Sequence, residues 1–108
     1  MKTVALVVDT LNIMICLGKT FGKGKLNYQK YLENAIGDDI LFSGIAYGCF
    51  KGGEHKFMDY LKHLGLEVKF KPPIFKTNGE TRDTSSRWVN WNVGIAVDVI
   101  RIANTGKI

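Results

Sequence analysis

The stretch Lys2-Thr-Val-Ala-Leu-Val-Val-Asp-Thr-Leu-Asn12 decides which fold the sequence predicts. Val4 to Val8 is a short, uninterrupted apolar run rich in β-branched residues, which is typical of a strand buried at the centre of a parallel sheet. The run ends at Asp9, and Asn12 follows three residues later. Because open α/β sheets bind ligands beyond the carboxyl ends of their strands, Asp9 is a candidate functional residue. Capping of the next helix is the alternative role for this aspartate.

The composition predicts one small domain with a basic surface. The 108 residues are 45% hydrophobic, which is enough for a single core, and the net charge of +5 favours an anionic partner such as nucleic acid. Cys16 and Cys49 lie in apolar segments without metal-ligand spacing, so we expect buried free thiols. No apolar stretch is long enough to span a bilayer and no cleavable signal pattern is present. The sequence therefore predicts a cytoplasmic protein that does not bind membranes.

Apolar periodicity predicts an alternation of strands and helices along the rest of the chain. The expected elements are a short helix or turn over 13–17, a helix over 28–35 capped by Asn27, a strand over 40–50, a helix over 54–64, a strand over 66–71 and a buried helix over 91–103. Strands that alternate with helices predict an α/β fold, with a parallel sheet joined by right-handed crossovers.

Two segments are rich in basic residues and are candidates for contacts with a polyanion. The segment 18–25 carries lysines, and the polar segment 74–90 carries cations beside Trp88. Cations that bind phosphates and an aromatic ring that stacks on bases suit a single-stranded nucleic acid. Solvated loops without a function are the alternative. The candidate nucleic-acid-binding residues are Lys19, Lys23, Lys25, Lys76, Arg82 and Arg87.

Asp98 lies in the middle of the apolar helix over 91–103 and is the second candidate functional residue. A lone buried carboxylate costs several kcal/mol or takes up a proton, so it needs a cation, a set of hydrogen bonds or a metal ion. An ion pair with a lysine or arginine is the alternative to a functional role. Asn92 lies six residues earlier, which is not a same-face spacing, so it could join Asp98 only from the first turn.

Taken together, these motifs resemble the NYN domain, the PIN-like nuclease group that includes the LabA-type proteins. That family opens with a strand ending in Asp-Gly-x-Asn, and here Asp9-Thr-Leu-Asn12 stands at that place. The resemblance extends along essentially the whole chain. Its further matching segments are Lys25-Leu-Asn-Tyr28, Leu61-Lys-His-Leu-Gly-Leu-Glu-Val68, Lys71-Pro72 and Trp91-Asn-Val-Gly-Ile-Ala-Val-Asp98.

The resemblance implies a three-layer PIN-like (Rossmannoid) domain that hydrolyses RNA with Mg²⁺ or Mn²⁺. By motif, Asp9 and Asp98 would be metal-binding acids, and Asn12 would orient the substrate or a water. Asn92 stands where the family has a further acid, so it is included among the candidate metal ligands. Hard divalent cations prefer such oxygen donors, and a bound metal ion activates water and stabilises charge on phosphoryl oxygens.

The sequence departs from the family pattern at three points. Thr10 replaces a glycine, Asn92 replaces an acid, and the family's next strand, which ends in Ser-Gly-Asp-Ser-Asp, is missing. We therefore expect residues 1–108 to form an NYN/PIN-like domain that is incomplete at its C-terminus and lacks the fourth strand. The open edge of the first strand would invite pairing into a homo-oligomer. An inactive RNA-binding module and a structural subunit completed through this sheet edge are the alternatives to a ribonuclease.

Overall fold

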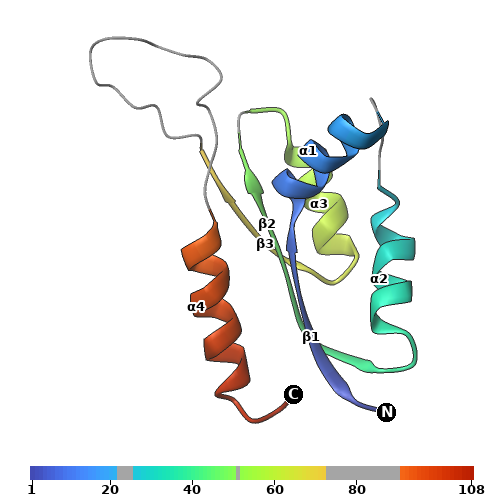
Figure 1. Cartoon of the computed structure of the whole chain (residues 1–108), viewed down its shortest axis with the longest axis vertical. Coiled ribbons are helices and arrows are strands. Elements are labelled where there is room, and N and C mark those ends of the chain that lie inside the picture. Colours follow the sequence, from blue (N-terminus) through green and yellow to red (C-terminus); the bar gives the residue numbers. More distant parts are fainter. Residues whose placement is uncertain (22–25, 51, 73–90) are drawn as a thin grey trace.

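The computed structural model describes residues 1–21, 26–50, 52–72 and 91–108, with the backbone alone for 18–21. Its elements are β1 (Thr3–Asp9), α1 (Thr10–Phe21), α2 (Tyr28–Ile36), β2 (Ile40–Cys49), α3 (His55–His63), β3 (Glu67–Lys71) and α4 (Asn92–Ala103). The strands form a parallel sheet in the order β1-β2-β3. Figure 1 shows α4 on one side of this sheet and the other helices on the opposite side. The predicted α/β fold, with a central parallel sheet between layers of helices, is confirmed.

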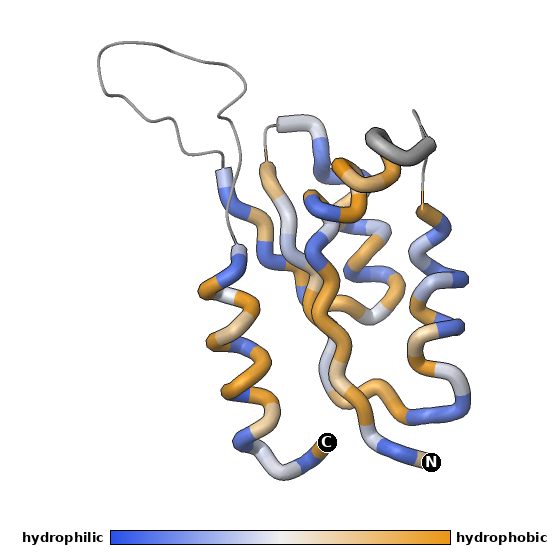
Figure 2. Tube along the Cα trace, in the orientation of Figure 1, coloured by the Kyte–Doolittle hydropathy of each residue, from blue (hydrophilic) through white to orange (hydrophobic). Residues whose placement is uncertain are grey.

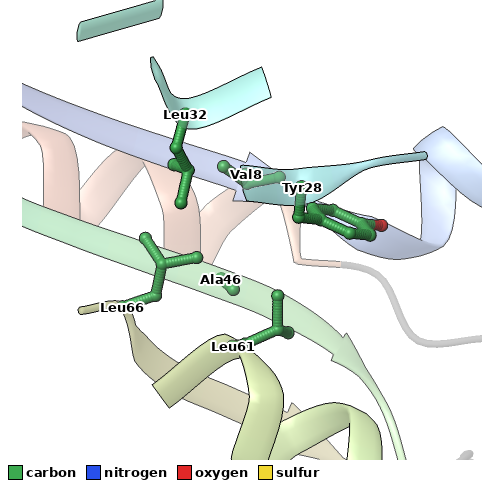
Figure 3. Packing of buried hydrophobic residues seen from close by; sticks show 6 residues of the cluster. All are labelled: Val8, Tyr28, Leu32, Ala46, Leu61 and Leu66. Atoms are coloured by element: carbon green, nitrogen blue, oxygen red, sulfur yellow. The ribbon is translucent and has the colours of Figure 1, made fainter. Parts of the chain in front are cut away.

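One face of the sheet packs against α2 and α3. Tyr28 and Leu32 of α2 and Leu61 of α3 meet Val8 of β1 and Ala46 of β2 (Figure 3). These side chains are at most 6% exposed, so this face holds a close-packed apolar core.

The opposite face of the sheet carries a second core beneath α4. Tyr47 of β2 packs against Trp91, just before α4, with ring centroids 5.1 Å apart. The Trp91 indole Nε1 donates a 2.8 Å hydrogen bond to the carbonyl oxygen of Gly48. Ile102 packs into the same core from the last turn of the helix. Together these contacts hold α4 against the sheet along its length.

Local sequence signals set several of the element boundaries. The Asn27 side chain accepts a 3.2 Å hydrogen bond from the backbone N–H of Lys30, which confirms the predicted cap of α2. Gly65 has a φ of 95°, a conformation that glycine adopts without strain, and it follows the end of α3 as expected.

Helix α1 is longer than the sequence predicted, because it begins directly after Asp9. The Thr10 hydroxyl is buried and donates a 2.7 Å hydrogen bond to the carbonyl oxygen of Tyr47, which holds the start of α1 against β2. The segment from 18 to 21, expected to be a lysine-rich loop, is the last turn of this helix. Within this turn the backbone N–H groups bond to carbonyl oxygens of the preceding turn, which a loop would leave to solvent.

Strand β1 lies at an edge of the described sheet, whereas its apolar run taken alone is typical of a central strand. It pairs with β2 alone among the described strands, and most of its residues are only half-buried. An apolar run is compatible with this place because helices cover both faces of an edge strand while one side stays open. An apolar run indicates that both faces of a strand are covered by helices, but it does not indicate whether the strand has a hydrogen-bonded neighbour on each side.

Helix α4 and Cys16 are more exposed than predicted. The thiol of Cys16 lies at the surface of α1. In α4 only Asp98 and Ile102 are buried. A helix contacts a sheet along one stripe, so an apolar sequence on its remaining sides stays uncovered unless another element packs there. Its most exposed large apolar residues are Val93, Val97, Val99 and Ile100.

None of the helices in the described part of the chain could cross a lipid bilayer. Even α1 and α4 have only 12 residues each, and a membrane span requires roughly 20 apolar residues.

Candidate functional site

Asp9 is the last residue of β1, at the carboxyl end of the sheet. Its Oδ2 accepts a 2.7 Å hydrogen bond from Nδ2 of Asn12, and its Oδ1 accepts a 3.2 Å hydrogen bond from the Asn12 backbone N–H. The second bond satisfies a free N–H of the first turn of α1, so Asp9 also has the capping role that the sequence left open. The structure therefore brings Asp9 and Asn12, two of the candidate site residues, together.

The sheet register places Asp9 beside two polar side chains of the neighbouring strands. Asp9 is paired with Tyr47 of β2, and Tyr47 is paired with Lys69 of β3. Side chains alternate along a strand, so Asp9 lies on the same face as Val7, which packs under α4. Asp9, Tyr47 and Lys69 thus form a row across the sheet on the face that α4 covers.

Asp98 extends from the middle of α4 towards this row and is 7% exposed. Its Oδ2 accepts hydrogen bonds from the Tyr47 hydroxyl at 2.8 Å and from Nζ of Lys69 at 2.9 Å. A guanidinium nitrogen of Arg101 lies 3.4 Å from its Oδ1. The need of the buried carboxylate for partners is confirmed, and the partners include the cations of the ion-pair alternative.

These contacts shift the acidity of both buried groups. Hydrogen bonds from Lys69 and then Tyr47 hold the pKa of Asp98 below the ordinary aspartate value, against the opposing effect of burial. Burial, followed by the hydrogen bond to Asp98, raises the pKa of Tyr47 well above the ordinary tyrosine value. Asp98 is therefore ionised and Tyr47 is protonated at neutral pH.

The other candidate metal ligand, Asn92, lies apart from this network. Asn92 is the exposed first residue of α4, whereas Asp98 is buried six residues, or about 1.7 turns, later, so the two occupy different sides of the helix as their spacing predicts. Within residues 1–21, 26–50, 52–72 and 91–108, no three acidic, histidine or cysteine side chains are grouped closely enough to hold a metal ion.

The predicted nucleic-acid-binding residues are mostly beyond what the structure describes. Lys19 belongs to the last turns of α1 and not to a loop. The remaining five lie outside the described residues, namely Lys23, Lys25, Lys76, Arg82 and Arg87.

Sequence reasoning missed the basic residues of β3 as part of the site. Nζ of Lys71 lies 3.8 Å from the centre of the Trp91 ring, and Lys69 contacts Asp98. The alternation of Glu67-Val-Lys-Phe-Lys71 places both lysines on one face, and that signal was visible in the sequence. Whether α4 covers the face that carries these lysines depends on long-range packing, and no local sequence pattern predicts it.

A shallow hollow of about 100 Å³ lies at the same end of the sheet on the opposite face. Residues of α1, α3 and the strand ends line it, and most of its surface is apolar, with Phe57 and Phe70 among its walls. Asp9, Tyr47 and Lys69 are not among its lining residues, so this hollow is separate from the polar row.

Comparison with known proteins supports the fold and assigns no activity. No protein-family model and no curated protein matches the chain. Its fold is similar to the crystal structure of a protein of unknown function from Vibrio parahaemolyticus RIMD 2210633, with a TM-score of 0.76 and 25% sequence identity. The match covers 94% of this chain and 60% of that chain, so this chain spans about three fifths of its neighbour's length. The fold defines a small Rossmann-like α/β domain.

Proposed function

We propose that this domain hydrolyses RNA phosphodiester bonds with the help of Mg²⁺ or Mn²⁺, as NYN/PIN-like ribonucleases do. The observation that carries the proposal is the position of Asp9, a carboxylate paired with Asn12 at the carboxyl end of β1. Ligands of open α/β sheets bind at this end of the strands, where the direction of strand addition reverses.

The placement of α4 supports a reversal of strand order beside β1. Helices α2 and α3 connect successive strands and cover one face of the sheet, whereas α4 follows β3 on the other face and contacts β1. Right-handed parallel folds with helices on both faces add their strands in opposite directions through the two faces, and these directions diverge at the first strand. The crevice that such folds use for ligands would then open beside Asp9.

The donors around Asp9 are compatible with a Mg²⁺ or Mn²⁺ ion. Mg²⁺ is commonly held by one or two carboxylates, with waters and substrate phosphates completing its shell. Asp9 offers a carboxylate, and the amide oxygen of Asn12 remains available because Asn12 uses its Nδ2 to bind Asp9. A bound ion would make a water more acidic and stabilise charge on the phosphoryl oxygens.

Asp98 would join this site from α4 or would act through its neighbours. Lys69 places a positive charge 2.9 Å from the Asp98 carboxylate. Tyr47, which is paired with Asp9 in the sheet, donates a hydrogen bond to Asp98. In the proposed site, the hydrogen bonds from Tyr47 and Lys69 to Asp98 fix the position of α4 relative to the strand ends where Asp9 lies. Lys71 supplies a further cation for phosphate at the carboxyl end of β3. The basic residues of segments 19–25 and 76–87 are further candidates from the sequence alone.

Cleavage of a labelled single-stranded RNA by the purified 108-residue chain tests this proposal. We expect cleavage with Mn²⁺ or Mg²⁺, none with a chelator, and none above background for Asp9→Asn. Asn12→Ala should lower the rate about 10- to 100-fold, because it removes the partner that orients Asp9. Asp59→Asn, a change of an exposed acid on α3, is the matched control and should retain wild-type activity. Metal-independent cleavage, or cleavage retained by Asp9→Asn, would contradict the proposal.

An RNA-binding module without catalysis is the second candidate. The specific observation in its favour is that Lys69, Tyr47 and Arg101 already satisfy Asp98. A module of this kind would bind single-stranded RNA with an affinity that falls steeply with salt, because its contacts replace counterions. RNA binding by a folded chain that cleaves nothing with any metal would support this second function over the first.

A further inference from the structure

The resemblance to NYN/PIN-like ribonucleases implies that Asp98 binds a metal ion, but its surroundings in the structure suit an ion pair. Helix α4 is apolar along most of its length (Figure 2), and Asp98 is its buried acid. A buried carboxylate is stable in such a place only when cations or hydrogen bonds balance its charge. The groups around Asp98 therefore determine whether a metal ion can bind there.

The contacts of the Asp98 carboxylate come from side chains of this chain. Oδ2 accepts hydrogen bonds from the Tyr47 hydroxyl at 2.8 Å and from Nζ of Lys69 at 2.9 Å. A guanidinium nitrogen of Arg101 lies 3.4 Å from Oδ1. The cations of Lys69 and Arg101 already balance the single negative charge, and both would repel a divalent ion at the same oxygens.

The packing around Asp98 also leaves little room for the waters of a bound ion. Mg²⁺ keeps several waters in its octahedral shell and loses them reluctantly. Tyr47 is fully buried and packs against Trp91, and Asp98 itself is only 7% exposed. Asp9 differs, because it is half-buried at the end of β1 and its hydrogen bonds with Asn12 lie at the surface. An ion at Asp9 could keep its waters, whereas one at Asp98 could not.

We propose that Lys69 takes the place of a metal ion at Asp98, so that a divalent ion binds at Asp9 without Asp98 as a ligand. Lys69 stands in the same row across the sheet as Asp9. Its side chain is 31% exposed, so its charge also acts on a phosphate near the strand ends. The ion at Asp9 rests on the proposed function, whereas the pair of Lys69 with Asp98 rests on the contacts described above.

Mn²⁺ binding, measured by electron paramagnetic resonance of the free ion, tests the first half of this proposal. Asp98→Asn should bind Mn²⁺ within about threefold of wild type, the effect of one screened charge. Glu67→Gln, which removes the same charge from an exposed site of β3, is the matched control and should give the same result. Asp9→Asn should weaken binding about tenfold or more, because it removes a carboxylate ligand. Binding that Asp98→Asn loses and Glu67→Gln keeps would overturn the proposal.

A double-mutant cycle in urea, with a chelator present, tests the ion pair without any metal ion. Asp98→Asn should lower the folding equilibrium constant about tenfold more in the wild-type chain than in Lys69→Met, because the two side chains interact directly. Arg101→Gln should couple less strongly to Asp98, since the Arg101 side chain is 61% exposed and its contact is longer. Additive effects of Lys69→Met and Asp98→Asn would overturn the proposal.

The two measurements separate this inference from the proposed function. A wild-type chain that binds no Mn²⁺ contradicts the proposed function, and the double-mutant cycle then decides whether Lys69 is the cation of Asp98. Mn²⁺ binding that depends on both Asp9 and Asp98 supports the proposed function and overturns this inference.

Discussion

Asp98 connects the helix layer to the sheet through charged hydrogen bonds. The carboxylate is buried, and its partners come from β2, from β3 and from its own helix. Removing the charge leaves the Lys69 ammonium without its anion in a partly covered position, which is costly. The network therefore contributes to stability whether or not Asp98 takes part in catalysis.

Asp98→Asn should lower the free energy of unfolding by about 2 kcal/mol at pH 7, the usual size of hydrogen bonds to a charged group. The folded-state pKa of Asp98 lies below the ordinary value of 3.8, so its contribution is complete above that value and is lost as the pH falls through the folded pKa. Urea unfolding at pH 7 and at low pH measures both effects. The difference between variant and wild type should shrink as the wild-type carboxylate takes up its proton.

Asp59→Asn is the matched control, because Asp59 is exposed on α3 and its substitution should change stability by no more than about 0.5 kcal/mol. A stability deficit for Asp98→Asn that stays constant down to low pH would contradict this account of the network.

The sequence predicted the demand of Asp98 for a partner but not the identity of that partner. A carboxylate in an apolar helix requires compensation by general physical chemistry alone. That Lys69 provides it depends on the pairing of β2 with β3 and on the side of the sheet that α4 covers. Contacts set by register and layer are not encoded in any short stretch of sequence, so they became visible only in the folded chain.

At the scale of single elements, the close packing of β2 against its neighbours positions Asp9. A Cβ added to Gly48 would lie 2.6 Å from the ring of Phe70 and 2.8 Å from the hydroxyl of Thr10. Thr10 follows Asp9 directly and is bonded to the carbonyl oxygen of Tyr47. The absence of a side chain at residue 48 therefore allows β2, Phe70 of β3 and the start of α1 to meet.

Gly48→Ala should lower the free energy of unfolding by about 1–3 kcal/mol, because the added methyl group overpacks this contact. Gly44→Ala is a useful comparison, since its Cβ would crowd chiefly the Cδ2 methyl of Leu66, and we expect a smaller loss. Thermal or urea unfolding of the two variants gives the comparison. Equal stability of Gly48→Ala and wild type would show that the contact is looser than the structure indicates.

Elements with strong local signals were predicted well, and those that depend on distant contacts were not. The Asn27 cap and the alternation of β3 identified their elements from a few residues. The full extent of α1 depends on the bond from Thr10 to Tyr47, 37 residues away, and was missed. The exposure of α4 was missed because an apolar sequence does not report which neighbours exist to cover it.

At the scale of the whole molecule, the fold directs attention to one end of the sheet. Asp9, the start of α4 and the lysine at the end of β3 lie at the carboxyl ends of the strands. The net charge of +5 favours an anionic ligand there, since positive potential concentrates polyanions near the surface. A phosphate-containing substrate at this end of the sheet is part of the proposed function, and its central claim is a metal site at Asp9.

Mn²⁺ binding to the purified chain, measured by electron paramagnetic resonance of the free ion, tests this claim most directly. We predict that wild type and Asp59→Asn bind Mn²⁺ and that Asp9→Asn loses this binding while it keeps the same fold by circular dichroism. Equal Mn²⁺ binding by Asp9→Asn and wild type, or no binding by the wild type with RNA present, would contradict the claim.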